Sequence, residues 1–252
     1  MGELSHQEEL RYNRQIVLPE FGFEGQLALK QARVLIIGVG GLGCSVAQSL
    51  AASGVGQLTL VDFDKVELSN LQRQILHREA TLGQLKTLSA RQALEQLNPW
   101  LKIKCIDNKL EGQELLAEVA QHSVVVDCTD NQQSREALNQ ACFTSRTPLV
   151  SGSAIRNEGQ LITFCYGEDE PCYRCLSRLF GSVPESCVDR GVLAPVVSII
   201  GSLQALAVIK LLSQVGSITA GQLQLFDGRQ GGFREMKLAR DPGCEVCSEK
   251  NR

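Results

Sequence analysis

The stretch from Val34 to Asp64, VLIIGVGGLGCSVAQSLAASGVGQLTLVDFD, limits the fold of this chain more narrowly than any other. A short apolar run, Val34–Ile37, is followed by glycines and then by apolar residues at helical spacing from Gly41 to Ser53. Gly54 ends that helix, and Leu58–Asp62 follows as a second apolar run. A strand, a glycine turn, a helix and another strand predict a βαβ unit with its strands parallel in one sheet.

The same alternation continues along the chain. The remaining expected elements are helices in the first thirty residues, at Gly83–Leu97 and around Leu115–Val119, and strands at Ile103–Ile106 and Val124–Asp127. After Pro148, LVSGSAIRNEGQLITFCY and GQLQLFDGRQGGFREMKLA predict antiparallel strands, and Ala194–Ser213 predicts a long helix between them. We therefore expect an α/β fold with a Rossmann-like, doubly wound mixed sheet, parallel in its N-terminal part and antiparallel at its C-terminal strands. No linker or repeat divides residues 1–252, so we expect a single domain.

The composition supports neither nucleic-acid nor membrane binding. Lys and Arg number 25 against 28 Asp and Glu, which is not the basic excess that nucleic-acid binding requires. We expect no apolar run long enough to span a bilayer. The N-terminus, MGELSHQEELRYNRQ, lacks the apolar segment of a signal peptide. These features predict a soluble, cytoplasmic protein.

The glycine-rich turn predicts a phosphate site. Gly38, Gly40 and Gly43 fit the pattern G-x-G-x-x-G, in which glycines let a phosphate approach the free N–H groups of a helix N-terminus. Asp62 ends the next strand, where a carboxylate accepts hydrogen bonds from ribose hydroxyls. This motif indicates an adenine nucleotide and fits the NAD of an oxidoreductase as well as ATP. A turn with nothing bound is the simpler alternative.

Two cations beyond the acid favour ATP over NAD. The segment DFDKVELSNLQRQ places Asn70, Arg73 and Gln74 shortly after Asp62, and Lys86 follows on an expected helix. Backbone N–H groups largely suffice for the pyrophosphate of NAD, whereas a triphosphate that expels pyrophosphate needs fixed positive charges. Either cation alone also fits a solvated surface position. The two together at this spacing indicate a triphosphate site.

Two carboxylates lie in VVVDCTDN, at the expected carboxyl end of a strand. Asp127 and Asp130 fall where open α/β sheets bind ligands, and carboxylate oxygens are ligands that Mg²⁺ prefers. Asp130 also fits the N-cap of a helix beginning in NQQSREALNQ. Capping and metal binding can coexist, so both remain open.

The ten cysteines are unevenly distributed. Cys172, Cys175, Cys244 and Cys247 form two Cys-x-x-Cys pairs, the spacing of a Cys₄ zinc site. Four thiolates leave no open position on the metal, so such a zinc is structural and would fix the C-terminal tail. Redox-active pairs are the alternative. Five single cysteines lie in apolar segments and are expected in the core: Cys44, Cys105, Cys128, Cys142 and Cys165. The three histidines, His6, His77 and His122, carry no motif and are expected at the surface.

Several motifs occur in the order found in the E1-like adenylyltransferases of bacterial sulfur-carrier pathways, the HesA/MoeB/ThiF family, which this chain resembles. They are GVGGLG, DFD, SNLQRQ, a downstream lysine, DCTDN, CYRC and CEVC. The resemblance runs from Arg11 in RYNRQ to Cys247 and is far more specific than the glycine loop alone. Within the family the chain most resembles the branch that serves molybdopterin synthase.

The resemblance implies a set of ATP contacts. They are Gly38, Gly40, Gly41, Gly43, Asp62, Ser69, Asn70, Leu71, Gln72, Arg73, Lys86, Asp130 and Asn131. In the family's pattern Asn70, Arg73 and Lys86 face the phosphates. Asp130 binds Mg²⁺ in that pattern. Arg14 in RYNRQ matches an arginine that reaches into the ATP site of the neighbouring subunit, which implies a homodimer.

The implied reaction is ATP-dependent adenylation of a small ubiquitin-like sulfur-carrier protein that ends in Gly-Gly. The C-terminal glycine carboxylate is activated, pyrophosphate is released, and a separate donor (a cysteine desulfurase or a rhodanese) supplies sulfur for molybdopterin synthesis. The same chemistry on a carrier of the thiamine pathway or of another thiolation pathway is an alternative.

Cys187 in PESCVDRGVLAP lies where relatives place a cysteine on a loop that crosses the active site. It would carry an acyl or sulfur intermediate, or be a spectator thiol at the surface. Two other classes of protein compete with the adenylyltransferase. An NAD-dependent oxidoreductase leaves Arg73, Lys86 and the cysteine pairs unexplained, and a zinc-stabilised scaffold without catalysis does not require every polar motif position.

Overall fold

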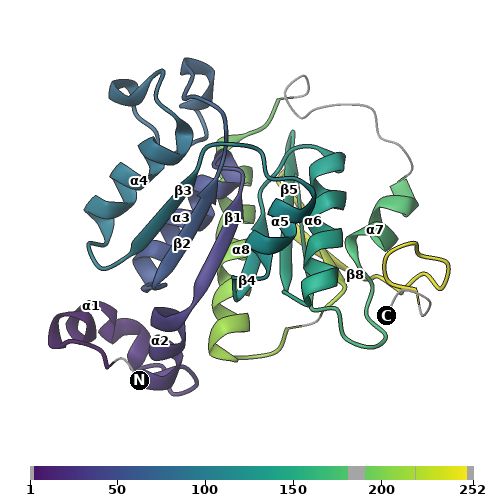
Figure 1. Ribbon diagram of the computed structural model, residues 1–252, viewed down its shortest axis with the longest axis horizontal. Helices are drawn as coiled ribbons and strands as arrows, with labels where there is room; N and C mark the ends of the chain where they lie inside the picture. Colours follow the sequence, from purple (N-terminus) through teal and green to yellow (C-terminus); the bar gives the residue numbers. More distant parts are fainter. Residues whose placement is uncertain (1–2, 181–190, 219, 249–252) are drawn as a thin grey trace.

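One eight-stranded sheet in the order β3-β2-β1-β4-β5-β6-β7-β8 organises the chain. The computed structural model describes residues 3–180, 191–218 and 220–248 (Figure 1). The strands are β1 (Arg33–Ile37), β2 (Gln57–Val61), β3 (Lys102–Ile106), β4 (Val124–Asp127), β5 (Leu149–Ile155), β6 (Glu158–Phe164), β7 (Gln222–Asp227) and β8 (Gly232–Lys237). Strands β1 to β5 are parallel, and β6 to β8 are antiparallel. The expected mixed, doubly wound sheet is therefore confirmed.

Strand β5 corrects one expectation at the change of direction. We expected the whole of LVSGSAIRNEGQLITFCY to be antiparallel. Instead β5 pairs in parallel with β4, from Val125 opposite Leu149 to Asp127 opposite Ser151. Only its other edge is antiparallel, to β6. A strand in the middle of a sheet has two partners, and its sequence does not say which direction each of them takes.

Helices cover both faces of the sheet (Figure 1). They are α1 (His6–Ile16), α2 (Gly22–Gln31), α3 (Gly41–Ser53), α4 (Lys86–Leu97), α5 (Gly112–Val119), α6 (Gln132–Ser145), α7 (Tyr173–Phe180) and α8 (Ala194–Ser213), with 3₁₀ turns η1 (Leu68–Asn70) and η2 (Glu79–Thr81). Along β1, Val34 and Ile36 face a core shared with α2, α3, α4 and α8, whereas Leu35 faces a core shared with α5, α6 and α7. Strands that are buried on both faces in this way have unbroken apolar runs in their sequences.

Two helices differ from their expected bounds. The first thirty residues form two helices, α1 and α2, because residues 17–21 turn between them. Helix α4 begins at Lys86 instead of Gly83, since Gly83 has φ +80°, outside the helical region. Helix α3 has the expected bounds and ends at Gly54 in the left-handed conformation.

Helix α8 also contradicts an expectation. It is one helix among the described residues with the length and apolar composition to cross a bilayer. It packs against α3, β5 and β6, and Gly201 allows its close approach to Ser45 of α3. These are the contacts of a core helix, which passes the same test of length and composition.

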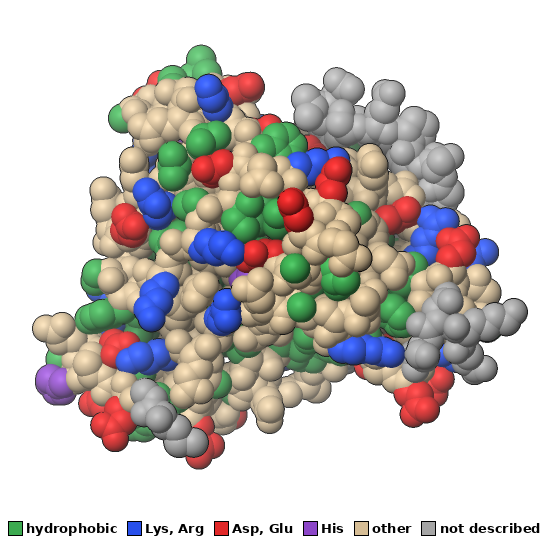
Figure 2. Space-filling view, viewed as in Figure 1, with side chains coloured by type: hydrophobic (Ala, Val, Ile, Leu, Met, Phe, Trp, Pro, Cys, Tyr) green, Lys and Arg blue, Asp and Glu red, His purple; other side chains and the backbone are tan. Residues whose placement is uncertain are grey.

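On the visible face of the molecule, Lys and Arg side chains are interspersed with Asp and Glu (Figure 2).

Candidate active site

The predicted nucleotide residues gather where β1 and β4 lie side by side. From β1 the chain runs outward through β2 and β3, whereas from β4 it runs in the other direction through β5. The chain therefore reverses direction across the sheet between β1 and β4. Open α/β sheets bind ligands in the crevice outside the carboxyl ends of the strands at such a point.

The glycine loop joins β1 to α3 at this crevice. Gly38 has φ +91°, and its N–H donates to the carbonyl of Val61 at 2.8 Å. A Cβ at Gly38 would lie 2.7 Å from the Cys128 carbonyl oxygen, and one at Gly43 would lie 1.9 Å from the Gly38 oxygen. These two glycines are thus required by contacts within the protein. A Cβ at Gly40, by contrast, would meet nothing closer than 3.7 Å.

Helix α3 begins at this loop without a side-chain cap. Gly40 is its N-cap, and its first turn contains no acidic residue. The first N–H groups of a helix have no partner within the helix, and the helix dipole adds positive potential there. The N-terminus of α3 therefore has the chemistry of an anion site, as the sequence predicted.

Asp62 is fixed at the end of β2 by two backbone donors. Its Oδ2 accepts the N–H of Val39 at 2.7 Å, and its Oδ1 accepts the N–H of Asp64 at 2.9 Å. Burial raises the pKa of Asp62, and the positive charge of Lys86 opposes that rise. Each carboxylate oxygen retains a lone pair for another donor, so Asp62 can still accept from a ribose hydroxyl.

Lys86 reaches the same edge of the sheet from the first turn of α4. It is 7 % exposed, and its Nζ pairs with Asp64 Oδ2 at 2.8 Å. Asp64 is the second acid of DFD, and the sequence analysis gave it no role. The side chain of Asp64 is 54 % exposed, so it can release the lysine at little cost when a stronger anion arrives.

Arg73 lies against the glycine loop. Its Cγ is 3.4 Å from the position that a Cβ of Gly41 would occupy. Its Nη1 donates to the carbonyl of Ser69 at 3.1 Å, and among the described residues the guanidinium bonds only within its own segment. Asn70 is buried, and its Oδ1 accepts the N–H of Glu67 at 3.1 Å. The SNLQRQ segment is therefore a folded turn that presents Arg73 to the loop.

Two glutamines in that turn differ in what they contact. The Nε2 of Gln72 donates to the carbonyl of Val192 at 3.1 Å, which joins the turn to the segment leading into α8. Gln74 is 4 % exposed and lies beside Gly40, and its Oε1 has no hydrogen-bond partner in the part of the chain that the structure describes. An unpaired acceptor at this depth is costly unless a donor arrives. The sequence predicted no role for Gln74, although its place directly after Arg73 was a usable signal.

At the end of β4, Asp127 and Asp130 have separate environments. The Asp127 carboxylate is fully buried and accepts from Thr129 N–H at 3.0 Å and Ser151 Oγ at 2.7 Å. It fixes the loop after β4, whereas Asp130 is exposed at the same edge. The cap of α6 is Asn131, whose side chain accepts from Ser134 N–H, so Asp130 is not the cap. Its exposed carboxylate has the chemistry to bind a metal ion.

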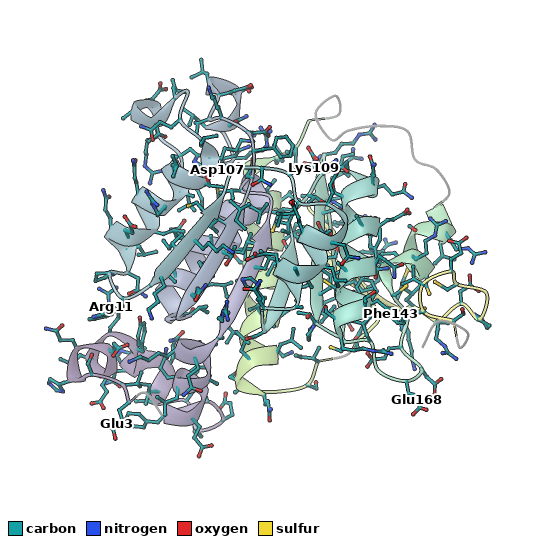
Figure 3. The ribbon with its side chains drawn as sticks, in the orientation of Figure 1. Glu3, Arg11, Asp107, Lys109, Phe143 and Glu168 are labelled. Carbon is teal, nitrogen blue, oxygen red and sulfur yellow. The ribbon has the colours of Figure 1, made fainter. Side chains whose placement is uncertain are left out.

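Arg14 lies away from this site. Arg14 is exposed in the last turn of α1, and α1 lies at the foot of the sheet (Figure 1). Figure 3 shows the same separation, with Arg11 of α1 at the foot and Asp107, after β3, at the upper edge. Cys187 falls within residues 181–190, which lie outside the described residues.

Two histidines expected at the surface are buried. His77 is 3 % exposed and contacts Val39, Cys44 and Ser89, and His122 bonds Thr59 Oγ1 at 2.8 Å. Burial lowers the pKa of each ring below the ordinary value for histidine. Only His6 is exposed as expected. The sequence did not predict the burial of His77 and His122, because each has polar neighbours in the sequence and its bonding partners come from distant segments.

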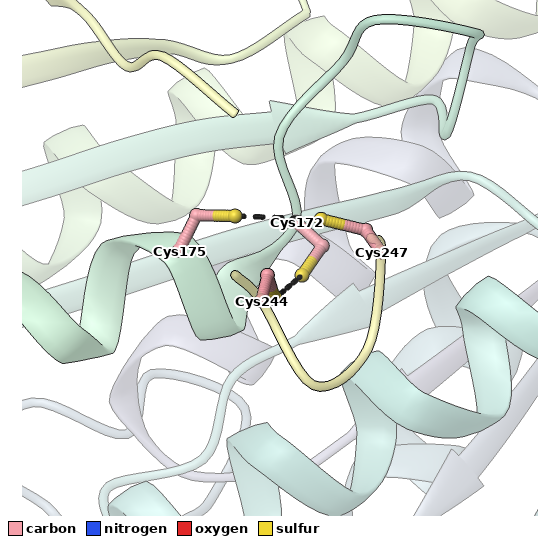
Figure 4. Close-up of side chains that lie close together, drawn as sticks. All are labelled: Cys172, Cys175, Cys244 and Cys247. Carbon is pink, nitrogen blue, oxygen red and sulfur yellow. Dashed lines mark hydrogen bonds between the residues drawn. The ribbon is translucent and has the colours of Figure 1, made fainter. Parts of the chain in front are cut away.

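The four paired cysteines form one buried cluster (Figure 4). Their Sγ atoms lie within 4.8 Å of one another, with Cys172 3.7 Å from Cys244 and Cys175 3.4 Å from Cys247. A tetrahedron with zinc–sulfur bonds of about 2.3 Å requires sulfur atoms about 3.8 Å apart. A hydrogen bond from Cys172 lowers the pKa of Cys175, which favours the thiolate form that binds a metal ion. The donor set and its spacing fit zinc.

The cluster ties the C-terminal tail to α7. Cys172 and Cys175 lie at the start of α7, and Cys244 and Cys247 lie on the tail that follows β8. Other bonds reinforce this junction: Arg174 of α7 bridges Glu136 of α6 and Glu245 of the tail, each at 2.8 Å. Three of the single cysteines are buried, whereas Cys105 and Cys165 are only partly so.

The sequence model of the ThiF family matches residues 12–246. This chain belongs to the ThiF family. Among proteins of known function, it is 56 % identical over 249 residues to the molybdopterin-synthase adenylyltransferase of Salmonella typhimurium, covering 99 % of this chain and all of that one. It is also 47 % identical to the adenylyltransferase and sulfurtransferase MOCS3 of Drosophila ananassae, over 98 % of this chain and 55 % of that longer protein.

Solved structures of this family share the fold. The crystal structure of Escherichia coli MccB with AMPCPP and MccA superimposes with a TM-score of 0.82 at 25 % identity. The match covers 94 % of this chain and 74 % of MccB. The mixed sheet and its helical layers are therefore the architecture of a ThiF-family enzyme.

Proposed function

We propose that this chain adenylates the C-terminal glycine carboxylate of a small ubiquitin-like sulfur-carrier protein, with ATP and Mg²⁺, in molybdopterin synthesis. One observation carries the proposal: the glycine loop, Asp62, Arg73 and Lys86 meet at the crevice between β1 and β4. The chain is also 56 % identical over almost its whole length to a molybdopterin-synthase adenylyltransferase.

The proposed chemistry needs no general base. The glycine carboxylate is ionised at neutral pH, because its ordinary pKa is well below 7. A carboxylate oxygen attacks the α-phosphorus, the bond between the α-phosphorus and the bridging oxygen breaks, and pyrophosphate leaves with the electron pair. The products are an acyl adenylate and pyrophosphate, so the protein has to align the reactants and stabilise the leaving charge.

The side chains of the crevice suit these tasks. The uncapped N-terminus of α3 receives phosphate oxygens, and Asp62 accepts from the ribose. Arg73, beside Gly41, and Lys86, on leaving Asp64, neutralise the departing pyrophosphate. Asp130 would hold Mg²⁺, which would supply positive charge beside the phosphates. The buried Oε1 of Gln74 would gain its missing donor from the nucleotide.

The remaining parts of the proposal extend beyond this one crevice. We infer a homodimer in which Arg14 serves the partner's site, since α1 carries it away from its own. Cys187 would receive the acyl or sulfur group or be a spectator, and a separate cysteine desulfurase or rhodanese would supply sulfur. We further propose that residues 1–252 form one cytoplasmic domain with structural zinc on its four paired cysteines.

Pyrophosphate exchange into ATP tests the proposal. The chain is incubated with Mg²⁺, ATP, labelled pyrophosphate and each of a panel of Gly-Gly-tailed carriers from molybdopterin and thiamine synthesis. We expect exchange only when a carrier is present, and fastest with the molybdopterin carrier. Faster exchange with the thiamine carrier would assign the chain to that pathway. Exchange without any carrier would contradict the proposed substrate.

A further inference from the structure

His77 joins the glycine loop to α4. Its Nε2 lies 3.2 Å from the carbonyl oxygen of Val39, the second residue of the loop. Its Nδ1 lies 2.9 Å from Ser89 Oγ, one turn of α4 beyond Lys86. The ring therefore bridges the segment that faces the phosphates and the helix that supplies a cation.

The Val39 peptide groups are held on both sides. The N–H of Val39 donates to Asp62, and its carbonyl accepts from His77 and from the thiol of Cys44, whose Sγ is 3.5 Å away. In a trans peptide the carbonyl and the following N–H point in opposite directions. Holding the Val39 carbonyl toward the buried ring therefore turns the N–H of Gly40 away from it.

A neutral ring can make both bonds at once. The Nε2–H then donates to Val39, and Nδ1 accepts from the hydroxyl of Ser89 when that hydroxyl turns from Thr81 Oγ1, its other neighbour at 2.9 Å. The groups that face the ring favour this form, because Lys86 of α4 and Arg78 before η2 are cations and burial raises the pKa of Cys44 to about 12, which keeps that thiol uncharged. Histidine acts here as a donor with a fixed direction.

We propose that His77 is a positioning residue for ATP, which orients the N–H groups of the glycine loop through the Val39 carbonyl and fixes their distance from α4. The proposal rests on the adenylation function proposed above. Its contribution is to nucleotide binding, because the ring is buried behind the loop and does not touch the reacting atoms. Loss of the bridge should therefore raise the KM for ATP more than it lowers kcat.

Two substitutions at His77 separate the hydrogen bond from packing. His77→Leu removes both bonds, whereas His77→Gln retains a donor for Val39 and an acceptor for Ser89. We expect His77→Leu to raise the KM for ATP about tenfold, the upper range for one lost hydrogen bond, with kcat within about threefold of the original. His77→Gln should restore most of the affinity. Ser89→Ala, which leaves the histidine in place, should shift KM in the same direction by a smaller factor.

His122→Leu is the matched control. His122 is as deeply buried and also has a pKa lowered by burial, but it bonds Thr59 and Glu118 away from the glycine loop. It should lower the melting temperature without changing the KM for ATP. An unchanged KM in folded His77→Leu, or an equal rise in His122→Leu, would overturn the proposal. If His77→Leu does not fold, an unchanged KM in Ser89→Ala would overturn it.

Calorimetric titration with ATP and Mg²⁺ separates this proposal from the proposed function. Direct binding needs no carrier, so a chain that binds ATP but exchanges pyrophosphate with no carrier contradicts the adenylation reaction alone. In that case the binding constants of the His77 variants still decide the role of the ring. A chain that binds no ATP contradicts both proposals.

Discussion

At the scale of single residues, the proposed nucleotide site contains two cations, Arg73 and Lys86, that have no strong partner within the residues that the structure describes. Arg73 bonds within its own turn, and Lys86 is paired with an exposed acid. Neither is committed to a strong buried partner, so both can turn toward phosphate at small cost. The anion site is therefore ready without ligand-induced refolding of the SNLQRQ turn.

Arg73→Ala should abolish most of the activity and leave the fold intact. We expect carrier-dependent pyrophosphate exchange to fall at least about 100-fold, the scale of one lost charge-stabilising group. The melting temperature should change by less than about 2 °C, because the side chain is only half-buried and bonds locally. Arg91→Ala on the exposed face of α4 is the control. Full exchange in Arg73→Ala would remove this residue from the mechanism.

At the scale of elements, the glycine loop divides into two kinds of glycine. Gly38 and Gly43 are required because backbone atoms occupy the space of a side chain, whereas a Cβ at Gly40 would make only an ordinary contact, 3.7 Å from Gln74 Nε2. The sequence pattern marks all three alike, because it records where a side chain is absent and not which neighbour excludes it. Only the packing of β4 and α3 against the loop distinguishes them.

Gly43→Ala should destabilise the protein and Gly40→Ala should not. A Cβ at residue 43 would overlap the Gly38 carbonyl oxygen, which is backbone and cannot rotate away, so we expect a loss of about 3 kcal/mol or more. Gly40→Ala should lose less than about 1 kcal/mol, the ordinary cost of alanine at an N-cap. Urea denaturation of both variants measures the difference. Equal losses would contradict the packing described for the loop.

Much of the structure of these elements could be predicted from the sequence. Strands buried on both faces, the G-x-G-x-x-G turn and the Cys-x-x-Cys pairs leave local patterns, so β1, α3 and the cysteine cluster were placed correctly. The burial of His77 and the pairing of Lys86 with Asp64 were not, because their partners lie 38 and 22 residues away. The start of α4 was missed because a glycine with positive φ looks like any other glycine in a sequence.

At the scale of the whole molecule, the cysteine cluster joins the chain end to the rest of the fold. The tail bonds α7, and α7 is tied through Glu136 to α6, the helix that follows Asp130. Removal of zinc should therefore loosen the tail and weaken the edge of the active site. The cluster belongs to the same apolar core as α5 and α6, so loss of zinc should also lower the free energy of unfolding of the whole protein.

Cys247→Ser should lower the melting temperature by roughly 10 °C and make the tail sensitive to protease, since metal binding contributes directly to folding free energy. Zinc content, measured by atomic absorption, should fall in parallel. Cys105→Ser, a half-buried thiol outside the cluster, should keep its zinc. A Cys247→Ser protein with one zinc per chain and an unchanged melting temperature would contradict a structural Cys₄ site.

The buried histidines should make stability depend on pH. The pKa values of His77 and His122 in the folded protein lie below 6.5, so the unfolded chain binds protons more readily as the pH falls. Their contribution is therefore complete above about pH 6.5 and is lost progressively as the pH falls toward the lowered values. The urea midpoint of unfolding should decrease as the pH is lowered from about 7.5 to about 5.5. In the double variant His77→Gln, His122→Gln this decrease should be smaller. An equally steep decrease in the double variant would assign it to other groups.

The most direct test is a crystal structure of this protein with AMPCPP and Mg²⁺. We predict that the triphosphate lies over the N-terminus of α3, in the crevice between β1 and β4. The ribose should bind Asp62, and side-chain nitrogen atoms of Arg73 and Lys86 should lie within about 3 Å of phosphate oxygens. A nucleotide bound elsewhere, or bound there with both cations turned away from it, would contradict the account.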